Sequence, residues 1–280
     1  MSEHIVFKGG TSLSKVYNLI KRFSEDVDLA IDRNYLGFEG MLTRGDIRKL
    51  RRASHDFSLN EVPRILQAQL EEYGIDTELY EIDVPNTEIS DQDPEIIFIN
   101  YRSVFEEEKY LPDRVQIEIG ARSLNEPFST RSIGSIIDGT FGDSKFVEEP
   151  FDVKSVIPEK TFLEKMILLH EEFQKPEKKI RSPRMSRHLY DIYALHNTRY
   201  GEAALADEEL FRTICTHRAV FTPVRGVGYS ELKLSGLNIL PTGDFEGLYK
   251  DDYLAMRENM IYGESPKFEE LIETVKKILM

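Results

Sequence analysis

Two aspartates separated by a single residue are the first candidates for chemistry. Asp26 and Asp28 open the segment Asp26–Ile31, in which polar and apolar residues alternate with the period of a strand. Both carboxylates then project from one face, while Val27 and Leu29 project from the other. Neighbouring carboxylates repel unless a cation lies between them, and hard oxygen ligands favour Mg²⁺. The pair predicts a magnesium site, although a solvated strand face would show the same pattern.

A pair of glycines precedes the aspartates. Gly9 and Gly10 follow the β-prone residues 4–7 and precede residues 13–20, whose apolar positions have helical spacing from Leu13 to Ile20. Thr11 or Ser12 can cap this helix, which we expect to end near residues 21–22. Glycine lets the backbone approach a phosphate closely, and a helix start offers free N–H groups and a positive dipole end. The spacing is not that of a Walker A loop. We predict a phosphate-binding turn ahead of the aspartate strand.

A third carboxylate is expected to complete such a metal site. Glu118 lies in the alternating segment 114–121, where Ile117 and Ile119 share one face and Glu118 shares the other with Gln116. Glu118 is therefore a candidate third ligand. Ordinary amphipathic alternation explains the same residues equally well.

The second half of the chain offers a lysine in an unusual place. Residues 159–173 are predicted to form a helix, and on its projection Lys165 lies between Leu168 and Leu169 rather than on the polar side. A lysine in an apolar sector either extends its ammonium to the surface or directs it at an anion.

The next predicted helix, residues 184–200, carries a polar stripe. Arg184, Arg187 and Asp191 recur at intervals of three and four residues. The spacing favours a simple ion pair between Arg187 and Asp191. The alternative is that Asp191 acts as a base while the two arginines bind phosphate.

The elements that position these residues indicate an α+β or mixed α/β fold. The first half contains a polar hairpin-type loop at residues 87–94 between two strand candidates. Strands with antiparallel connections argue against a regular doubly wound sheet. Further strands are predicted at residues 75–84, 95–104 and 114–121, and helices at residues 43–54 and 61–73.

The second half changes character, because helical patterns dominate it. We predict a domain boundary near residues 148–154, with a core at residues 1–150 and a mainly helical domain at residues 151–280. Besides the two helices described above, helices are predicted at residues 202–217, 251–262 and 267–279, and a loop or short hairpin at residues 221–240.

Composition and charge limit the function. The chain has 280 residues, 40% hydrophobic and 31% charged, with one cysteine and a net charge of −14. This composition is that of a globular protein without disulfides, and no apolar run is long enough to cross a membrane, so we expect a cytoplasmic protein. The acidic field repels nucleic acid, yet one basic island is a candidate RNA site or a solvated loop. The island contains Lys175, Lys178, Lys179, Arg181, Arg184 and Arg187.

Three pieces of the sequence together resemble the AbiEii/AbiGii-type nucleotidyltransferases, the toxins of abortive-infection toxin–antitoxin pairs to which the MenT toxins are related. Residues 7–13 (FKGGTSL) and 22–29 (RFSEDVDL) resemble the first motif of that family. Residues 158–169 resemble its lysine-bearing helix, and residues 187–195 (RHLYDIYAL) its final Arg/Asp motif. The pieces occur in the order of the family and span residues 5–196.

The resemblance implies a DNA polymerase β-like nucleotidyltransferase core followed by a helical domain. Asp26 and Asp28 would hold Mg²⁺, Ser12 and the glycine turn would contact an NTP, Lys165 would bind phosphate, and Asp191 would be the acidic catalytic residue. Some members transfer nucleotides to the 3′ end of tRNA and are neutralised by an antitoxin encoded alongside. Two alternatives remain: a non-catalytic nucleotide- or partner-binding protein of the same fold, and a nucleotidyltransferase acting on a small hydroxylated molecule.

Overall fold

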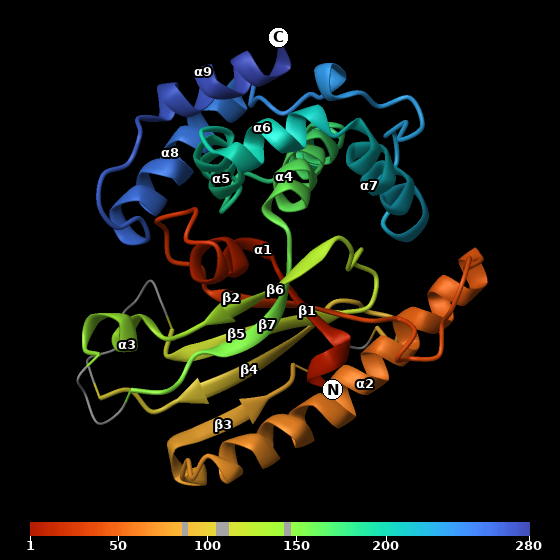
Figure 1. The fold of residues 1–280 in the computed structure, drawn as a ribbon. Coiled ribbons are helices and arrows are strands. Elements are labelled where there is room, and N and C mark those ends of the chain that lie inside the picture. Colours follow the sequence, from red (N-terminus) through yellow and green to blue (C-terminus); the bar gives the residue numbers. More distant parts are fainter. Residues whose placement is uncertain (86–88, 105–111, 143–146) are drawn as a thin grey trace. The chain divides into compact units, whose positions relative to one another are not determined.

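The computed structural model describes residues 1–85, 89–104, 112–142 and 147–280, which divide into two compact units (Figure 1). The sheet unit contains Met1–Tyr17 and Glu25–Val156. The helical unit contains Asn18–Ser24 and Ile157–Met280. A short strap of the N-terminal region, residues 18–24, is thus part of the helical unit, although the chain on both sides of it belongs to the sheet unit.

The sheet unit is built on a mixed seven-stranded sheet with the strand order β3-β4-β5-β2-β1-β7-β6. β2 runs parallel to β5 and β1 runs parallel to β7, while the other neighbours are antiparallel. The mixed α/β class predicted from the sequence is confirmed. The strands are β1 (Ile5–Lys8), β2 (Asp26–Ile31), β3 (Tyr80–Asp83), β4 (Glu95–Tyr101), β5 (Arg114–Gly120), β6 (Phe128–Ile133) and β7 (Phe151–Val156).

One long helix, α2 (Arg44–Glu72), covers one face of this sheet (Figure 1). Thr43 begins it with a capping box, and Val62 packs on Ile97, Ile117 and Ile119 of the sheet. The prediction of two helices, at 43–54 and 61–73, was wrong: the helix is continuous and contains Pro63. Its buried face runs from Ile47 to Val62, and this burial outweighs the loss of one backbone hydrogen bond at the proline.

Other differences in the sheet unit have local causes. The strand predicted at 75–84 is shorter, because a 3₁₀ turn, η3 (Thr77–Leu79), precedes β3. Part of the loop predicted at 87–94 lies outside the described residues. β6 and β7 were not predicted, nor was the short helix α3 (Ile136–Thr140). β7 pairs with β1 and β6, so residues 151–156 lie with the sheet rather than with the helices.

The helical unit packs around α4 (Pro158–Phe173), most of whose residues are buried. The helix predicted at 184–200 ends earlier, because Thr198 caps a new helix, and Asp207 likewise begins another inside the predicted 202–217 helix. The other elements are α5 (Ser186–His196), α6 (Arg199–Ala206), α7 (Glu208–Phe221), α8 (Asp244–Asn259), α9 (Phe268–Leu279) and the 3₁₀ turns η4 (Glu177–Lys179) and η5 (Leu234–Gly236). Among the described helices, none is both long and apolar enough to span a membrane.

Candidate functional site

The aspartates of β2 lie on the face of the strand that we predicted. Val27 and Leu29 pack with the core beneath α2, so Asp26 and Asp28 project from the opposite face. In the parallel pairing of β2 with β5, Asp28 lies beside Glu118. The three carboxylates therefore belong to two neighbouring strands and share one face of the sheet.

The backbone of Gly9 lies in close contact with the Asp28 side chain. Its φ of +75° lies in the left-handed region, and a Cβ added at this position would lie 1.9 Å from Oδ2 of Asp28. The Asp28 carboxylate thus lies directly against the glycine turn. Lys8 also lies near this carboxylate, with its Nζ 3.6 Å from Oδ1 of Asp28. The sequence shows only that the glycine turn comes before the aspartate strand, and in the fold the two are in contact.

Replacing Gly9 by alanine is expected to lower activity more than stability. The methyl group must displace the Asp28 carboxylate, and the positive φ adds a cost of about 1–2 kcal/mol to folding. Gly74→Ala is the matched control, because Gly74 has a φ of +73° with nothing within 4 Å of the added Cβ. Urea unfolding should show the cost of the positive φ in both variants and a further loss in Gly9→Ala from the displaced carboxylate, and only Gly9→Ala should lose the nucleotidyl transfer that the sequence resemblance implies. Equal activities of the two variants would contradict the role of this contact.

The residues after Gly9 differ from the prediction. Gly9, Gly10 and Thr11 form the short helix α1 (Gly9–Thr11), so Thr11 and Ser12 lie inside the helical turn and do not cap it. The Thr11 hydroxyl donates to the main-chain oxygen of Asp26, and the Ser12 hydroxyl donates to that of Gly9 at 2.9 Å. The Thr11 hydroxyl therefore joins the glycine turn to the aspartate strand, while the Ser12 hydroxyl fastens the turn itself.

The turn continues as η2 (Ser12–Val16), which is wound as a π-helix and ends at Tyr17. The longer helix expected through Ile20 does not form, since Asn18 takes a left-handed φ of 50° and the chain leaves the sheet unit there. Tyr17 is fastened by its hydroxyl, which lies 3.0 Å from the Ser129 hydroxyl on β6. A π-turn of this kind is uncommon in proteins and is frequent at functional sites.

The sheet unit offers a donor set suited to a divalent cation. Asp26, Asp28 and Glu118 supply carboxylate oxygens, which are the preferred ligands of Mg²⁺. Within the described residues, no three acidic, histidine or cysteine side chains are already arranged around a common point as metal ligands. The chemistry of these carboxylates and the register of β2 with β5 fit ligands of a divalent cation.

In the helical unit, the structure brings Lys165 and Asp191 together. The Lys165 ammonium, on α4, lies 2.8 Å from Oδ2 of Asp191 on α5. A third residue, Arg22 of the strap, binds both oxygens of the same carboxylate, with Nε and Nη2 each at 2.8 Å. Both cations come from outside the helix that carries Asp191, so spacing along that helix could not suggest them, and the Arg187–Asp191 ion pair stays a prediction.

Burial and charge set the protonation of this cluster. Burial alone would raise the pKa of Asp191, but the charges of Arg22 and Lys165 outweigh it and hold that pKa well below its usual range. Burial lowers the pKa of Lys165, which the Asp191 charge opposes. Burial, together with Lys165 and Arg187, holds the pKa of His188 well below 6.5, so this imidazole is neutral. An anion so firmly paired is a poor proton acceptor, which argues against Asp191 as a base.

Sequence reasoning did not identify Arg22 or His188 as site residues. Arg22 is 169 residues from its carboxylate partner, and no periodicity marks it. His188 is buried, and its Nδ1 has no hydrogen-bond partner among the described residues. The signal that the sequence offers for Arg22 is its place at the start of residues 22–29, the segment that resembles the first family motif.

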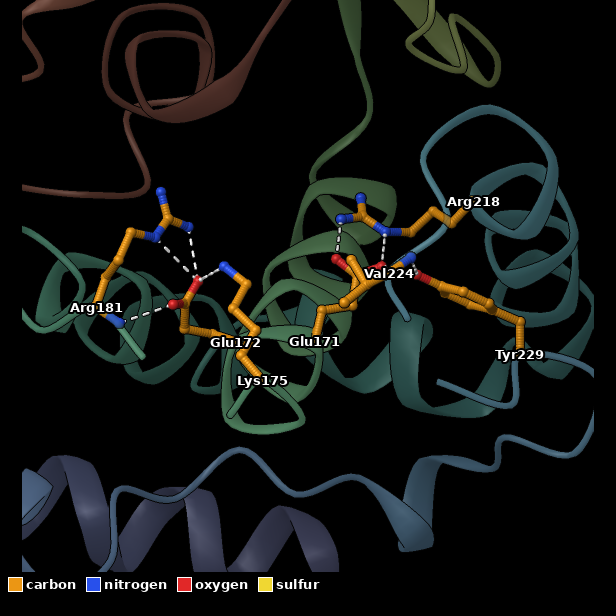
Figure 2. Close-up of polar contacts among 7 residues, drawn as sticks. All are labelled: Glu171, Glu172, Lys175, Arg181, Arg218, Val224 and Tyr229. Atoms are coloured by element: carbon orange, nitrogen blue, oxygen red, sulfur yellow. Dashed lines mark hydrogen bonds and ion pairs between the residues drawn. The ribbon is translucent and has the colours of Figure 1, made fainter. Parts of the chain in front are cut away.

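Part of the basic island is occupied by carboxylates of the fold (Figure 2). Lys175 and Arg181 both bind Oε2 of Glu172, at 2.6 and 2.7 Å, and the Arg181 main-chain N–H donates to Oε1 at 2.8 Å. The next residue back, Glu171, is bound by Arg218 and by the Tyr229 hydroxyl. Lys175 and Arg181 thus fasten the end of α4 through Glu172 and are poor candidates for an RNA contact.

Arg184 has a different environment. It takes a left-handed φ of 61°, which is rare outside glycine and carries strain. The Asp252 carboxylate holds this conformation by accepting from the main-chain N–H groups of Arg184 and Ser186, at 2.5 and 2.9 Å. Strained residues cluster at functional sites, so Arg184 remains a candidate for phosphate binding at the start of α5.

The acidic face beside the glycine turn and the Lys165–Asp191 pair are the features that the resemblance to nucleotidyltransferases singled out. Residues 1–274 match the pattern of the family described as "Nucleotidyl transferase AbiEii toxin, Type IV TA system". The chain belongs to this family and is a nucleotidyltransferase of the toxin class. The resemblance noted in the sequence is thereby confirmed.

Two solved structures resemble the chain along most of its length. JHP933 from Helicobacter pylori is 14% identical, with 99% of this chain and 84% of that one covered and a TM-score of 0.42. MenT4, the nucleotidyltransferase toxin Rv2826c from Mycobacterium tuberculosis H37Rv, is 16% identical, with the same coverage and a TM-score of 0.43. No curated protein matches the chain.

Proposed function

We propose that the protein transfers a nucleoside monophosphate from an NTP to the 3′ end of an RNA, with tRNA as the acceptor. The acceptor hydroxyl oxygen forms a bond to the α-phosphorus, the α–β phosphoanhydride bond breaks, and pyrophosphate leaves. The observation that carries the proposal is the contact of Asp28 with the glycine turn. A phosphate-binding backbone and a carboxylate that can bind a metal lie side by side there.

Each group is assigned a part by its chemistry. Asp26 and Asp28, with Glu118 on the adjacent strand, would hold Mg²⁺, which supplies Lewis-acid polarisation of phosphate oxygens when bound. The glycine turn at Gly9 and Gly10, which Thr11 and Ser12 fasten, would contact the triphosphate through its backbone.

In the helical unit, Lys165 offsets negative charge on phosphate, and Arg184 and Arg187 are the further candidates for this role. Asp191 orients Lys165 through their ion pair and is not the proton acceptor. This assignment replaces the alternative in which Asp191 acts as a base.

Family membership supports a cellular role as the toxin of a toxin–antitoxin pair, with an antitoxin protein as its partner. We place the protein and its RNA acceptor in the cytoplasm. One observation favours a different acceptor. The net charge is −14, and two cations of the basic island are taken by Glu172, which reduces the surface available to RNA. A small hydroxylated molecule is therefore the second candidate acceptor.

The test is incubation of the purified chain with total tRNA, Mg²⁺ and each labelled NTP in turn. We expect label in tRNA with a single preferred NTP, and none in tRNA whose 3′ hydroxyl has been oxidised with periodate. Transfer only to small hydroxylated acceptors would establish the second candidate. Tight NTP binding by calorimetry without transfer to any acceptor would identify a binding protein and refute the proposal.

A further inference from the structure

Arg22 is fixed in the helical unit by its own backbone. On either side of it, the Phe23 N–H donates to the Met260 oxygen at 2.7 Å, and the Tyr262 N–H donates to the Lys21 oxygen at 3.0 Å. The strap thereby pairs with the chain that follows α8. The Arg22 side chain is only 2% exposed, so its direction is set by the backbone and not by a mobile surface position.

Both edges of the Arg22 guanidinium donate hydrogen bonds. Nε and Nη2 form a two-point fork on the Asp191 carboxylate, and Nη1 donates to the Phe23 oxygen at 3.1 Å. A fork of this kind fixes the plane of a carboxylate as well as its position. Asp191 has no exposed surface, so its orientation, and with it the place of the Lys165 ammonium, depends on this fork.

The charges of the cluster do not cancel. Lys165 and Arg22 contribute two positive charges and Asp191 contributes one negative charge, while His188 nearby is neutral. If Arg22 were absent, Asp191 would neutralise Lys165, and the Lys165–Asp191 pair itself would carry no net charge to attract an anion; only the more general positive potential of Arg187 would remain. Because Arg22 satisfies the carboxylate, one positive charge remains in excess at this position, and Arg187 adds to the local positive potential.

We propose that Arg22 is a positioning residue of the phosphate site: it neutralises and orients Asp191 so that the Lys165 ammonium keeps its charge for a phosphate group. The inference rests on the phosphate-binding role proposed above for Lys165. The ligand class is a polyphosphate anion, and Arg22 acts on it through Asp191 and Lys165 without touching it.

The experiment measures binding of inorganic tripolyphosphate to the whole chain by calorimetry, with EDTA present and without nucleotide or acceptor. Arg22→Met removes the charge and the fork, while Arg22→Gln keeps an amide donor but removes the charge. The double variant Arg22→Met/Asp191→Asn removes one charge of each sign, so Lys165 again carries one uncompensated positive charge. Lys165→Met tests whether the measured binding is at this cluster.

Arg218→Met is the matched control. Arg218 forms a similar fork on the buried carboxylate of Glu171, elsewhere on α4 and with Tyr229 as its neighbour (Figure 2). The variant therefore also breaks a buried arginine–carboxylate pair of the helical unit, and we expect it to bind tripolyphosphate as the wild type does. Urea midpoints of all variants are recorded, so that general loosening of the unit is measured separately.

We expect both single Arg22 variants and Lys165→Met to weaken tripolyphosphate binding by about tenfold or more, since a buried positive charge is lost from the site or cancelled. The double variant should recover binding to within about threefold of the wild type, because the net charge is restored. A purely structural ion pair predicts the opposite, with the double variant at least as weak as the single ones.

Four results would overturn the inference: no tripolyphosphate binding by the wild type, unchanged binding in both Arg22 single variants, no recovery in the double variant, or an equal loss in Arg218→Met. The assay is independent of catalysis. A chain that shows the predicted binding pattern but transfers no nucleotide would refute the proposed reaction and leave the role of Arg22 standing.

Discussion

Replacing Asp28 by asparagine is expected to abolish nucleotidyl transfer, lowering its rate about a thousandfold or more. The substitution keeps the size of the side chain but removes the charge that lies against Gly9 and beside Glu118 on the adjacent strand. A neutral amide is a much weaker ligand for a divalent cation than a carboxylate. The ion pair of Asp28 with Lys8 is long, at 3.6 Å, and partly exposed, so the variant should fold normally.

The control for Asp28→Asn is the variant Asp56→Asn. Asp56 lies on the exposed side of α2, in the same unit, and its substitution removes the same charge away from the acidic face. Single-turnover transfer with labelled NTP and a urea unfolding curve should be measured for both variants. Asp28→Asn retaining more than about a tenth of the wild-type rate would remove Asp28 from the metal site.

The placement of the acidic face could be predicted from the sequence because it depends on local geometry. Side chains of a strand alternate between its faces, so Val27 and Leu29 being in the core requires Asp26 and Asp28 to be on the other side. The mixed fold class followed in the same way from strand and helix periods. The alternation could not predict which strands lie on either side of β2, because strand order depends on pairing between segments that are far apart in the sequence.

The helix expected after the glycine turn shows how a correct period can mislead. Leu13 and Ile20 are both fully buried, as the helical spacing required, but they are buried in different units. The helical turn has ended by Asn18, and Ile20 lies in the strap, which belongs to the helical unit. Periodicity reports that a residue is buried and does not report which core receives it.

β6 and β7 were missed for a related reason. The sequence of β6, FSTRSI, is largely polar and exposed, and it forms a strand because β7 offers it a row of hydrogen-bonding groups. It is the edge of the sheet, where little side-chain burial is needed. Local propensity carries no information about such a partner.

The buried cluster of the helical unit shows the same limit at the level of single residues. Spacing on one helix can suggest only local pairs, so it favoured Arg187 as the partner of Asp191. The structure adds two partners from outside that helix, Lys165 on α4 and Arg22, which is 169 residues away in the sequence. A carboxylate bound by two buried cations has large energetic consequences, and these can be measured without any assay of activity.

Asp191→Ala is expected to lower the free energy of unfolding by about 3–5 kcal/mol at pH 7, because it leaves two buried cations without their anion. Asp191→Asn should cost less, since the amide oxygen still accepts a hydrogen bond. The control is Glu273→Ala, which breaks an exposed pair with Lys276 on α9 and should leave the urea midpoint unchanged. A loss in Asp191→Ala no larger than that of the control would show that the cluster does not stabilise the unit.

The pH dependence of the free energy of unfolding shows whether the fold stabilises Asp191 in its charged or in its neutral form. The pKa of Asp191 is lowered in the folded chain, so its contribution is fully present above the pKa of the unfolded carboxyl, about 3.9, and is lost as the pH falls toward the lower folded pKa. Unfolding curves should therefore show a smaller difference between wild type and Asp191→Asn at pH 3 than at pH 7. If the difference grew on acidification, the carboxyl would be held in its neutral form, and both the assignment of its charge and the excess positive charge on Lys165 would be wrong.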